Sequence, residues 1–519
     1  IAVQLYAIRS TRNWGIGDFA DLAEFARLTA ASGADFVGCN PLHALFLAEP
    51  DRRSPFFPSN RRYLNPLYIA VDAVPGYSAS DAETATAARL RSDTLVDYAG
   101  VTTLKLGALR RLWPVWLAGA HANPAYAADA FEQFRHEGGE SLQRHCLHDA
   151  MALHMVTKGE GSLWTTWPED CHAPWAQGSQ TFAASQQEDV TFMAWLQWLA
   201  SVQLQQAQQV ALDAGMRIGL YLDFAVGEAP DGSAAWSDPL LTMRGVDVGA
   251  PPDYFSTTGQ NWGLAPLSPA ALVAQDLAPY AALVGASMHY AGALRIDHAM
   301  GIQQMFLVPQ GQTASTGTYI HYPLERMVET LAAASHHHRA VIIGEDLGNL
   351  PVGFRDVMEE AAILSYRILY FEQYVGRFFS PEEYPRNALA CVATHDLPTL
   401  EGWWRGEDVE LRRLHGLIGD DAARVQFEQR ASERHHLLEV LTASGALSHD
   451  DWETAWQAAY HPDPLPDRLT EGIHRFLART PSRLLAVRLE DLLGETLPVN
   501  LPGTVNEYPN WQRKLGSEL

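Results

Sequence analysis

The stretch ALRIDHAMG, residues 293–301, decides the fold of this chain. Its first five residues show the pattern that recurs along the sequence, a short apolar run that ends in charged residues. Ala293 and Leu294 begin an apolar run, and Arg295 and Asp297 place two charges at its end. The same arrangement returns in AVIIGEDLG (340–348) and in ACVATHDLPTL (390–400). Short apolar runs bounded by polar residues are typical of strands in a parallel sheet whose faces are covered by helices.

Eight such runs recur along the chain, with longer helical stretches between them. They are residues 2–7, 35–40, 217–224, 293–297, 340–345, 367–371, 389–394 and 484–489. Strands that alternate with helices predict a parallel sheet, and eight of them predict an α/β fold of the (β/α)8 TIM-barrel type. Charged and polar residues follow several of the runs, at the C-terminal strand ends where such barrels carry their functional groups.

The predicted barrel extends over residues 1–519 and carries insertions. A mainly helical subdomain is expected over residues 75–190, and a second helical insertion over residues 403–483. Residues 227–270 are rich in Gly, Pro, Asp and aromatic side chains, which predicts an active-site loop subdomain. Because residues 2–7 already form a predicted strand, we expect a natural N-terminal extension to be absent from this sequence.

The composition narrows the class of partner. The chain has 47% hydrophobic and 19% charged residues and no apolar run long enough to span a membrane. This composition predicts a globular protein. A net charge of −24 argues against nucleic acid and anionic membranes, and it leaves a neutral substrate open. The four cysteines, Cys39, Cys146, Cys171 and Cys391, include no CxxC pair. We therefore expect a cytoplasmic protein without a metal site or cofactor.

Arg295 and Asp297 lie two positions apart on one predicted strand, so their side chains point to the same side. Charges buried at that place need to be paired. Arg295 would keep Asp297 ionised, which is the state that a nucleophile requires. The alternative is a structural ion pair at a strand end.

Glu345 and Asp346 follow the apolar strand in AVIIGEDLG. A carboxyl group in apolar surroundings holds its proton more tightly and can serve as a proton donor at neutral pH. The alternative is that both acidic residues cap the following helix, where they would favour the positive end of its dipole.

His395 and Asp396 follow another apolar strand and precede a proline that stops regular structure. No HxxH or HExxH spacing accompanies them, so a pair that hydrogen-bonds to substrate hydroxyls is the preferred hypothesis over a metal site. The other histidines are given structural roles. Residues 336–338 and 435–436 are predicted to be solvated, and the helical set His145, His148 and His154 lacks a metal-ligand pattern.

Aromatic residues make up 10% of the chain, and most tryptophans in any protein belong to the core. Those in Gly-rich, polar loops such as GQNWG (259–263) are better candidates for stacking on sugar rings. The aromatic residues near the candidate site are Trp14, Phe56, Tyr254, Trp262, Trp403 and Trp404.

Nearly the whole chain resembles the 4-α-glucanotransferases of glycoside hydrolase family 77, the amylomaltases and disproportionating enzymes related to the α-amylases. The motifs that carry the resemblance are QLYAIRSTRNWGIGDF (4–19), NPLHALF (40–46), SPFFPSNRRYLNPLYI (54–69), GAPPDYFSTTGQNWG (249–263), ALRIDH (293–298), IIGEDLG (342–348), ATHDLPTLEGWW (393–404) and VNLPGTVNEYPNWQRKL (499–515).

The resemblance implies Asp297 as nucleophile, Glu345 as general acid/base and Asp396 as transition-state stabiliser. It also implies residues that contact sugar, namely Arg295, His395, Asp253, Gln260, Trp262 and, by a looser match, Asp223. The family pattern has tyrosine after Ser-Pro where this chain has Phe56, which keeps a ring for stacking and loses a hydroxyl contact.

The implied reaction is a retaining double displacement on maltooligosaccharides and α-1,4-glucans, with glucose or another α-glucan as acceptor. The residues leave two alternatives open. One is an α-glucan hydrolase of the α-amylase type, which uses the same carboxylates. The other is a glucan-binding protein without activity, against which the presence of all three carboxylates argues.

Overall fold

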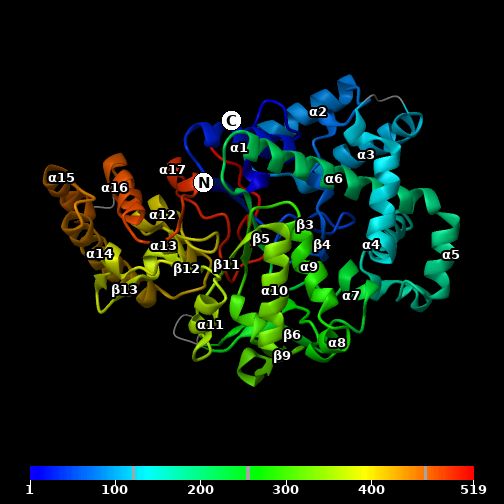
Figure 1. Cartoon of the computed structure of the whole chain (residues 1–519). Coiled ribbons are helices and arrows are strands. Elements are labelled where there is room, and N and C mark those ends of the chain that lie inside the picture. The colour runs from blue at the N-terminus through cyan, green and yellow to red at the C-terminus, as the bar shows by residue number, and fades with distance from the viewer. Residues whose placement is uncertain (120–122, 253–257, 461–463) are drawn as a thin grey trace. The chain divides into compact units, whose positions relative to one another are not determined.

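A computed structural model describes residues 1–119, 123–252, 258–460 and 464–519 of the chain (Figure 1). The chain forms two compact units. The larger unit holds residues 8–342, and the smaller unit holds residues 1–7 together with residues 343–519.

Three parallel strands form the centre of the larger unit, in the order β2 (Phe36–Cys39), β5 (Gly219–Phe224) and β8 (Ala293–Ile296). All residues of these strands are buried, which explains why the sequence shows them as continuous apolar runs. The next strand, β11 (Val341–Gly344), begins beside them, because the Val341 N–H donates to the Gly292 carbonyl over 2.9 Å.

Helices α1 (Phe19–Ala31), α6 (Gln187–Asp213) and α9 (Ala278–Met288) accompany these strands. Helices α1 and α6 pack on each other, and α6 and α9 pack on β5. Helix α1 begins at Asp18, whose side chain accepts from the Asp21 N–H while Asp21 accepts from the Asp18 N–H. This capping box satisfies backbone N–H groups that would otherwise lack partners. Asp18 and Asp21 therefore set the N-terminus of the helix at Phe19.

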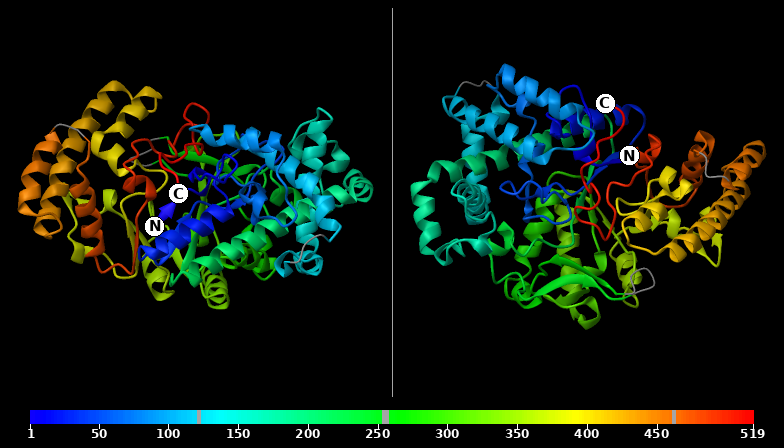
Figure 2. Two further views of the ribbon diagram at one scale, coloured as in Figure 1. Left: turned by 90° about the horizontal axis from the view of Figure 1, so that it is seen from above. Right: turned by 180° about the vertical axis from the view of Figure 1, so that it is seen from behind.

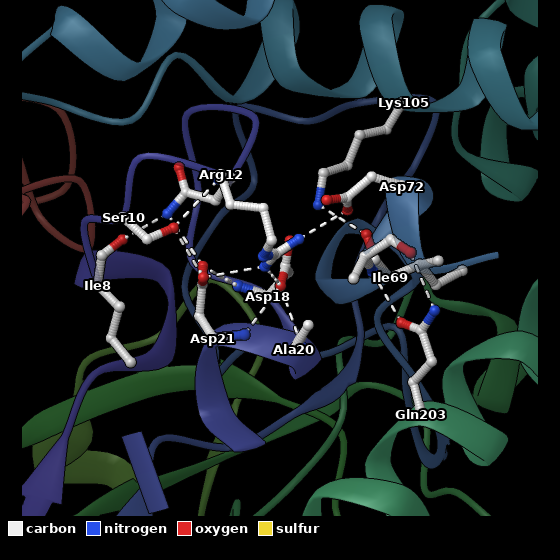
Figure 3. A network of polar contacts seen from close by, with 12 residues as sticks. Ile8, Ser10, Arg12, Asp18, Ala20, Asp21, Ile69, Asp72, Lys105 and Gln203 are labelled. Carbon is white, nitrogen blue, oxygen red and sulfur yellow. Dashed lines mark hydrogen bonds and ion pairs between the residues drawn. The ribbon is translucent and has the colours of Figure 1, made fainter. Parts of the chain in front are cut away.

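A partly buried polar network links the start of α1 to neighbouring segments (Figure 3). The Arg12 guanidinium pairs with Asp18, with Asp21 at 2.9 Å and with Asp72 at 2.6 Å. The ammonium group of Lys105 donates to the carbonyls of residues 67 and 69 at 2.7 and 2.8 Å. Burial lowers the pKa of Lys105 to about 8. Buried charges of this kind are tolerated because each is hydrogen-bonded.

Long helices fill much of the sequence between β2 and β5. They are α2 (Asp81–Ser92), α3 (Tyr98–Leu117), α4 (Ala128–Thr157) and α5 (Gln177–Ser185), followed by α6. Helix α4 is interrupted at Gly139, where φ is +53°. Rings from α3, α4 and α6 pack together at Trp113, Trp116, Phe131, Trp195 and Trp198. The sequence expectation of an inserted helical subdomain over residues 75–190 stays a prediction, since these helices belong to the larger unit with the strands.

An antiparallel sheet completes the larger unit, with strand order β10-β9-β6-β7. Its strands are β6 (Val246–Ala250), β7 (Gln260–Leu264), β9 (Gln304–Pro309) and β10 (Thr318–His321). The sequence predicts only a long loop at β6 and β7, because glycines and polar residues weaken the strand pattern there. The remaining elements are the pair β3 (His43–Ala44) and β4 (Asn60–Leu64), and the helices α7 (Ser233–Ser237), α8 (Pro269–Ala274) and α10 (Leu324–His338).

The smaller unit has its own parallel strands, β12 (Ser365–Ile368), β15 (Ala388–Cys391) and β16 (Leu484–Ala486). The Gly344 N–H donates to the Leu364 carbonyl over 2.8 Å, which places the end of β11 beside β12. On the other side, the N–H of Ala2 in β1 (Ala2–Val3) donates to the Val487 carbonyl over 2.8 Å. Strands β13 (Gln373–Tyr374) and β14 (Arg377–Phe378) form a hairpin.

Helices make up most of the rest of the smaller unit. They are α11 (Phe354–Glu360), α12 (Leu400–Arg405), α13 (Glu407–Leu414), α14 (Asp420–Ala443), α15 (His449–Tyr460), α16 (Asp467–Ala478) and α17 (Leu489–Leu492). Helices α14, α15 and α16 pack side by side (Figure 2). The 403–483 insertion expected from the sequence corresponds to α12–α16, although its standing as a separate insertion remains a prediction.

The predicted strands agree with the observed ones. Each of the eight apolar runs overlaps one strand of the parallel set β1, β2, β5, β8, β11, β12, β15 and β16. The sixth run is displaced, because the strand covers residues 365–368 and residues 369–371 form a short 3-10 turn. The α/β class is thereby confirmed, while pairings among the described residues do not themselves show a closed eight-stranded ring.

One expectation about histidines needs correction. His435 is not solvated, since its ring packs at 4.4 Å from those of Trp456 and Tyr460. His145 and His148 are buried beside Asp149, with His148 Nδ1 at 3.0 Å from its carboxylate. Within the described ranges, no cluster of three or more His, Cys, Asp or Glu side chains is arranged to hold a metal ion. Likewise, none of the described helices is long and apolar enough to cross a membrane.

Candidate active site

The larger unit carries a line of three charged side chains at the ends of two neighbouring strands. Strand register places Asp223 of β5 directly opposite Arg295 of β8. Arg295 Nη1 lies 2.8 and 2.9 Å from the two oxygens of Asp223, and Arg295 Nη2 lies 2.9 Å from Asp297 Oδ1. Arg295 thus holds both carboxylates through separate nitrogens, so each carboxylate keeps a charged partner although the site is mostly buried.

Exposure separates the two carboxylates that share Arg295. The Asp223 side chain is 9% exposed and the Asp297 side chain 19% exposed. Asp223 is therefore the more buried partner of Arg295, and Asp297 is the more exposed one. The structural ion pair that the sequence left open is present, and it is compatible with a reactive Asp297.

His298, which follows Asp297, has a left-handed backbone with φ of +49°. Burial lowers the pKa of its imidazole to about 4, so the ring is neutral near pH 7. Trp262 of β7 meets this ring edge-on, with centroids 5.2 Å apart. The Trp262 indole N–H donates to Gln260 Oε1 over 2.9 Å, which fixes these two predicted sugar contacts relative to each other. A non-glycine residue with positive φ is strained, and such strain clusters at functional sites.

In the smaller unit, Glu345 and Asp346 have different environments at the end of β11. Asp346 is fully buried and accepts hydrogen bonds from Arg355 Nε at 2.8 Å, from Ser365 Oγ at 3.1 Å and from the Tyr366 N–H at 2.8 Å. It is a structural anchor between β11 and β12. Glu345 is 8% exposed, and its Oε1 accepts from the Leu347 N–H over 2.8 Å.

The helix-cap alternative for these two acids is wrong. The following helix, α11, begins at Phe354 after Gly353, and no side chain caps it. Glu345 and Asp346 therefore lie too far upstream to satisfy the amide groups of its first turn.

His395 and Asp396 form a second pair of functional side chains in the smaller unit. His395 Nε2 lies 3.2 Å from Asp396 Oδ2, and Asn500 Nδ2 donates to Asp396 Oδ1 over 2.7 Å. The Trp511 ring lies 5.6 Å from the His395 ring. The Asp396 side chain is 50% exposed. Its carboxylate therefore contacts His395 and Asn500 and still has a solvent-exposed side.

Arg488 fixes the loop that carries this pair. Its guanidinium donates to the Thr394 carbonyl at 2.6 Å and to the Pro398 carbonyl at 2.9 Å, on either side of Asp396. Asp491 holds Arg488 at 2.8 Å and also accepts from the Leu400 N–H at 2.7 Å. The loop backbone is thus bonded at three points to one buried ion pair.

The remaining predicted residues have mixed outcomes. Phe56 is partly buried, whereas Trp14, Trp403 and Trp404 belong to the core and cannot serve as open sugar platforms. Asp253 and Tyr254 lie outside the described residues.

Sequence reasoning missed Asn500, Trp511, His298 and Arg488. The motif at 499–515 was recognised, yet nothing in its pattern indicates that it contacts Asp396, which lies 104 positions earlier in the chain. His298 was overlooked because its unusual backbone conformation is invisible in sequence.

Comparison with known proteins extends these observations. The model of glycoside hydrolase family 77, described as 4-alpha-glucanotransferase, matches residues 3–518. The 4-alpha-glucanotransferase of Haemophilus influenzae is 37% identical over 533 residues, covering 100% of this chain and 75% of that protein. The Mycobacterium tuberculosis 4-alpha-glucanotransferase is 35% identical over 526 residues, covering 99% of this chain and 70% of its own length.

Two solved structures share the fold. The amylomaltase from Corynebacterium glutamicum superposes with a TM-score of 0.87 at 32% identity, covering 99% of this chain and 71% of that one. The amylomaltase from Streptococcus agalactiae in complex with acarbose superposes with a TM-score of 0.76 at 18% identity, covering 99% of this chain and 94% of that one.

The chain belongs to glycoside hydrolase family 77. It is accordingly an enzyme, a 4-α-glucanotransferase of the amylomaltase type, as the motifs predicted. The α/β fold of the TIM-barrel type predicted from the eight apolar runs is confirmed by the same matches. Both alternatives, the α-glucan hydrolase and the inactive glucan-binding protein, are disfavoured by them.

Proposed function

We propose that the chain transfers α-1,4-glucan segments to the 4-hydroxyl of glucose or another α-glucan by a retaining double displacement. In this mechanism Asp297 is the nucleophile, Glu345 the general acid/base and Asp396 the transition-state stabiliser. Arg295, His395, Gln260, Trp262, Phe56, Asp223 and Asp253 are proposed to contact or orient the sugar.

The ion pair between Arg295 and Asp297 carries the proposal. At 2.9 Å, the guanidinium fixes the position of the Asp297 carboxylate, the group proposed to attack carbon. Because Asp223 holds the same guanidinium in a bidentate contact, Arg295 cannot swing to cover both Asp297 oxygens. One Asp297 oxygen therefore remains available for attack.

In the first step, an Asp297 oxygen forms a bond to the anomeric carbon while the glycosidic C–O bond breaks. Glu345 transfers its proton to the departing 4-oxygen, so the leaving glucan departs neutral. The position of Glu345 supports this role, because the side chain directly follows strand β11 and is held there by the Leu347 N–H.

In the second step, Glu345, now ionised, takes the proton of an acceptor 4-hydroxyl as that oxygen attacks the anomeric carbon. The bond to Asp297 breaks, the carboxylate is restored, and the anomeric carbon has been inverted twice. Asp396 and His395 are proposed to bind ring hydroxyls, with bonds that strengthen as positive charge develops on the sugar.

Transfer rather than hydrolysis requires that an acceptor sugar displace water at the covalent intermediate. We assign this task to residues 249–266, which lie within the active-site loop subdomain expected from the sequence and are proposed to act as a lid. These residues include β7, so deleting them would break the antiparallel sheet. Trp262→Ala is the better test, because it removes a stacking surface without shortening the strand. The ratio of hydrolysis to transfer should rise, and an unchanged ratio would remove the assignment.

The first experiment uses maltotriose as the sole substrate, with products separated by chromatography. A transferase makes glucose and a ladder of longer chains with little rise in total reducing ends, whereas a hydrolase raises them steadily. Asp297→Asn, Glu345→Gln and Asp396→Asn should each abolish the ladder. Asp356→Asn and Glu360→Gln, which alter exposed acids, are the matched controls. Undiminished disproportionation by Asp297→Asn would refute the nucleophile assignment.

A second experiment tests retention directly. Glu345→Ala is given α-maltosyl fluoride, whose fluoride leaves without protonation, and sodium azide as an external nucleophile. Attack of azide on the covalent intermediate should give α-maltosyl azide, because the anomeric carbon is inverted twice. The β-anomer would show that no covalent intermediate forms.

We also propose that the helices over 75–190 and 403–483 are insertions on the barrel, and that residues 227–270 border the substrate site. The antiparallel strands found within 227–270 give that segment a framework on which Gln260 and Trp262 are fixed.

A further inference from the structure

The segment 498–511, here called the C-terminal clamp, is a loop whose two ends contact the His395–Asp396 pair. One end contributes Asn500, whose amide donates to Asp396 Oδ1 over 2.7 Å. The other end contributes Trp511, whose ring lies 5.6 Å from His395 at an angle of 51°. Both functional side chains are therefore contacted by the same loop.

The clamp is rigid because it is hydrogen-bonded to itself. The Trp511 N–H donates to the Val499 carbonyl over 2.9 Å, which closes the loop. Inside it, the buried Asn510 accepts from the Leu501 N–H at 2.8 Å and donates to the Thr504 hydroxyl at 2.9 Å. The Tyr508 hydroxyl adds a bond of 2.6 Å to the Pro498 carbonyl.

Trp511 shows that the clamp holds a costly conformation. Its φ is +61°, in the left-handed region that a bulky side chain rarely adopts. Such a conformation is strained and persists only where the surrounding structure enforces it. Here the enforcing contacts place the Trp511 ring against His395.

Asp396 needs this support because it is half exposed. A carboxylate with water on one side can rotate about its terminal torsion, which is broad and has no strong preference. His395 Nε2 and Asn500 Nδ2 approach different oxygens of Asp396, at 3.2 and 2.7 Å. With both oxygens contacted, the plane of the carboxylate is defined before any substrate binds.

We propose that Asn500 is a positioning residue that orients the Asp396 carboxylate for the transition state, and that the C-terminal clamp exists to hold Asn500 and Trp511 against the His395–Asp396 pair. The inference rests on the role proposed for Asp396. The inference gives a role to the motif VNLPGTVNEYPNW, residues 499–511. The catalytic carboxylates by themselves do not explain this motif.

The test compares Asn500→Ala and Asn500→Asp with the native enzyme, using α-maltosyl fluoride as donor and glucose as acceptor. Asn500→Asp keeps the shape of the side chain and replaces the amide donor by a second carboxylate. Asn506→Asp makes the same chemical change at an exposed position of the clamp and is the matched control. We expect kcat to fall about 10- to 100-fold in both Asn500 variants, with donor KM within about threefold and melting temperature unchanged.

A double-mutant cycle with Asp396→Asn separates positioning from a structural role. If Asn500 acts through Asp396, then Asn500→Ala should cost nothing further in the Asp396→Asn background. Native kcat in both Asn500 variants, or an equal loss in the presence and absence of Asp396, would overturn the inference. Full activity of Asp396→Asn alone would instead overturn the role proposed for Asp396, so the two failures are distinguishable.

Discussion

Glu490 in α17 should make the smaller unit less stable as the pH rises, and Glu490→Gln should remove that dependence. The side chain is 6% exposed, and its Oε1 has no hydrogen-bond partner among the residues that the structure describes. Burial raises the pKa of Glu490 to about 7 from its ordinary 4.5, even though Arg488 opposes the rise.

The sign follows from the proton balance. Between pH 4.5 and about 7 the folded chain holds the Glu490 proton and the unfolded chain has released it, so stability falls as pH rises through this window. Below 4.5 the stabilising contribution is fully present, and above about 7 it is lost. A pKa of about 7 instead of 4.5 corresponds to roughly 3 kcal/mol, since each pKa unit is worth ~1.4 kcal/mol.

Urea unfolding monitored by fluorescence, together with calorimetry, measures the free energy of unfolding of the native chain and of Glu490→Gln from pH 4.5 to 8.5. Glu490→Gln should match the native chain near pH 4.5 and exceed it by roughly 2–3 kcal/mol at pH 8, because glutamine carries no charge to desolvate. Glu439→Gln, an exposed position in α14, is the control and should differ at neither pH. A difference between Glu490→Gln and the native chain that is constant across the pH range would refute the reasoning.

Three further predictions concern stability. Burial lowers the pKa of Lys105 to about 8 from 10.5. The free energy of unfolding of the native chain, relative to that of Lys105→Met, should therefore rise by roughly 3 kcal/mol between pH 8 and 10.5. Urea titration at each pH measures this difference. A flat difference would contradict the buried ammonium. Asp346→Ala leaves two buried donors, the Ser365 hydroxyl and the Tyr366 N–H, and the exposed Arg355 guanidinium without their acceptor. It should lower the urea midpoint by the equivalent of about 3–5 kcal/mol, whereas exposed Asp356→Ala should not. Leu438→Ala, at a fully buried position of α14, should cost about 2–5 kcal/mol in calorimetry, and a loss no larger than that of exposed Leu414→Ala would count against the packing described.

The parallel strands could be predicted from sequence because burial on both faces leaves an uninterrupted apolar signal. The antiparallel strands β6 and β7 gave no such signal. Their residues include glycines, and β7 is only partly buried. Strand β7 pairs with β6, and β6 pairs in turn with β9, more than fifty positions later in the chain. Local pattern carries no information about a partner strand at that distance.

The candidate site divides in the same way. Asp297, Glu345 and Asp396 could be found because each follows the end of an apolar strand and lies in a recognisable motif. Asp346 could not be told from Glu345 by sequence, since only the contacts of its carboxylate show that it anchors β12. Asn500 and Arg488 act through bonds to residues about 100 positions away, which no spacing rule reveals.

The bond from Ala2 to Val487 and the bond from Leu515 to Ala7 bear on how the chain assembles during synthesis. Residues 2–7 leave the ribosome before the larger unit does, and they cannot form these bonds until residues 487–515 have emerged. The whole of the larger unit can fold in that interval, because its residues form one continuous stretch. The smaller unit, in contrast, combines residues 1–7 with residues 343–519 and can close only after the larger unit has been made, which leaves its parts exposed to misassembly for longer.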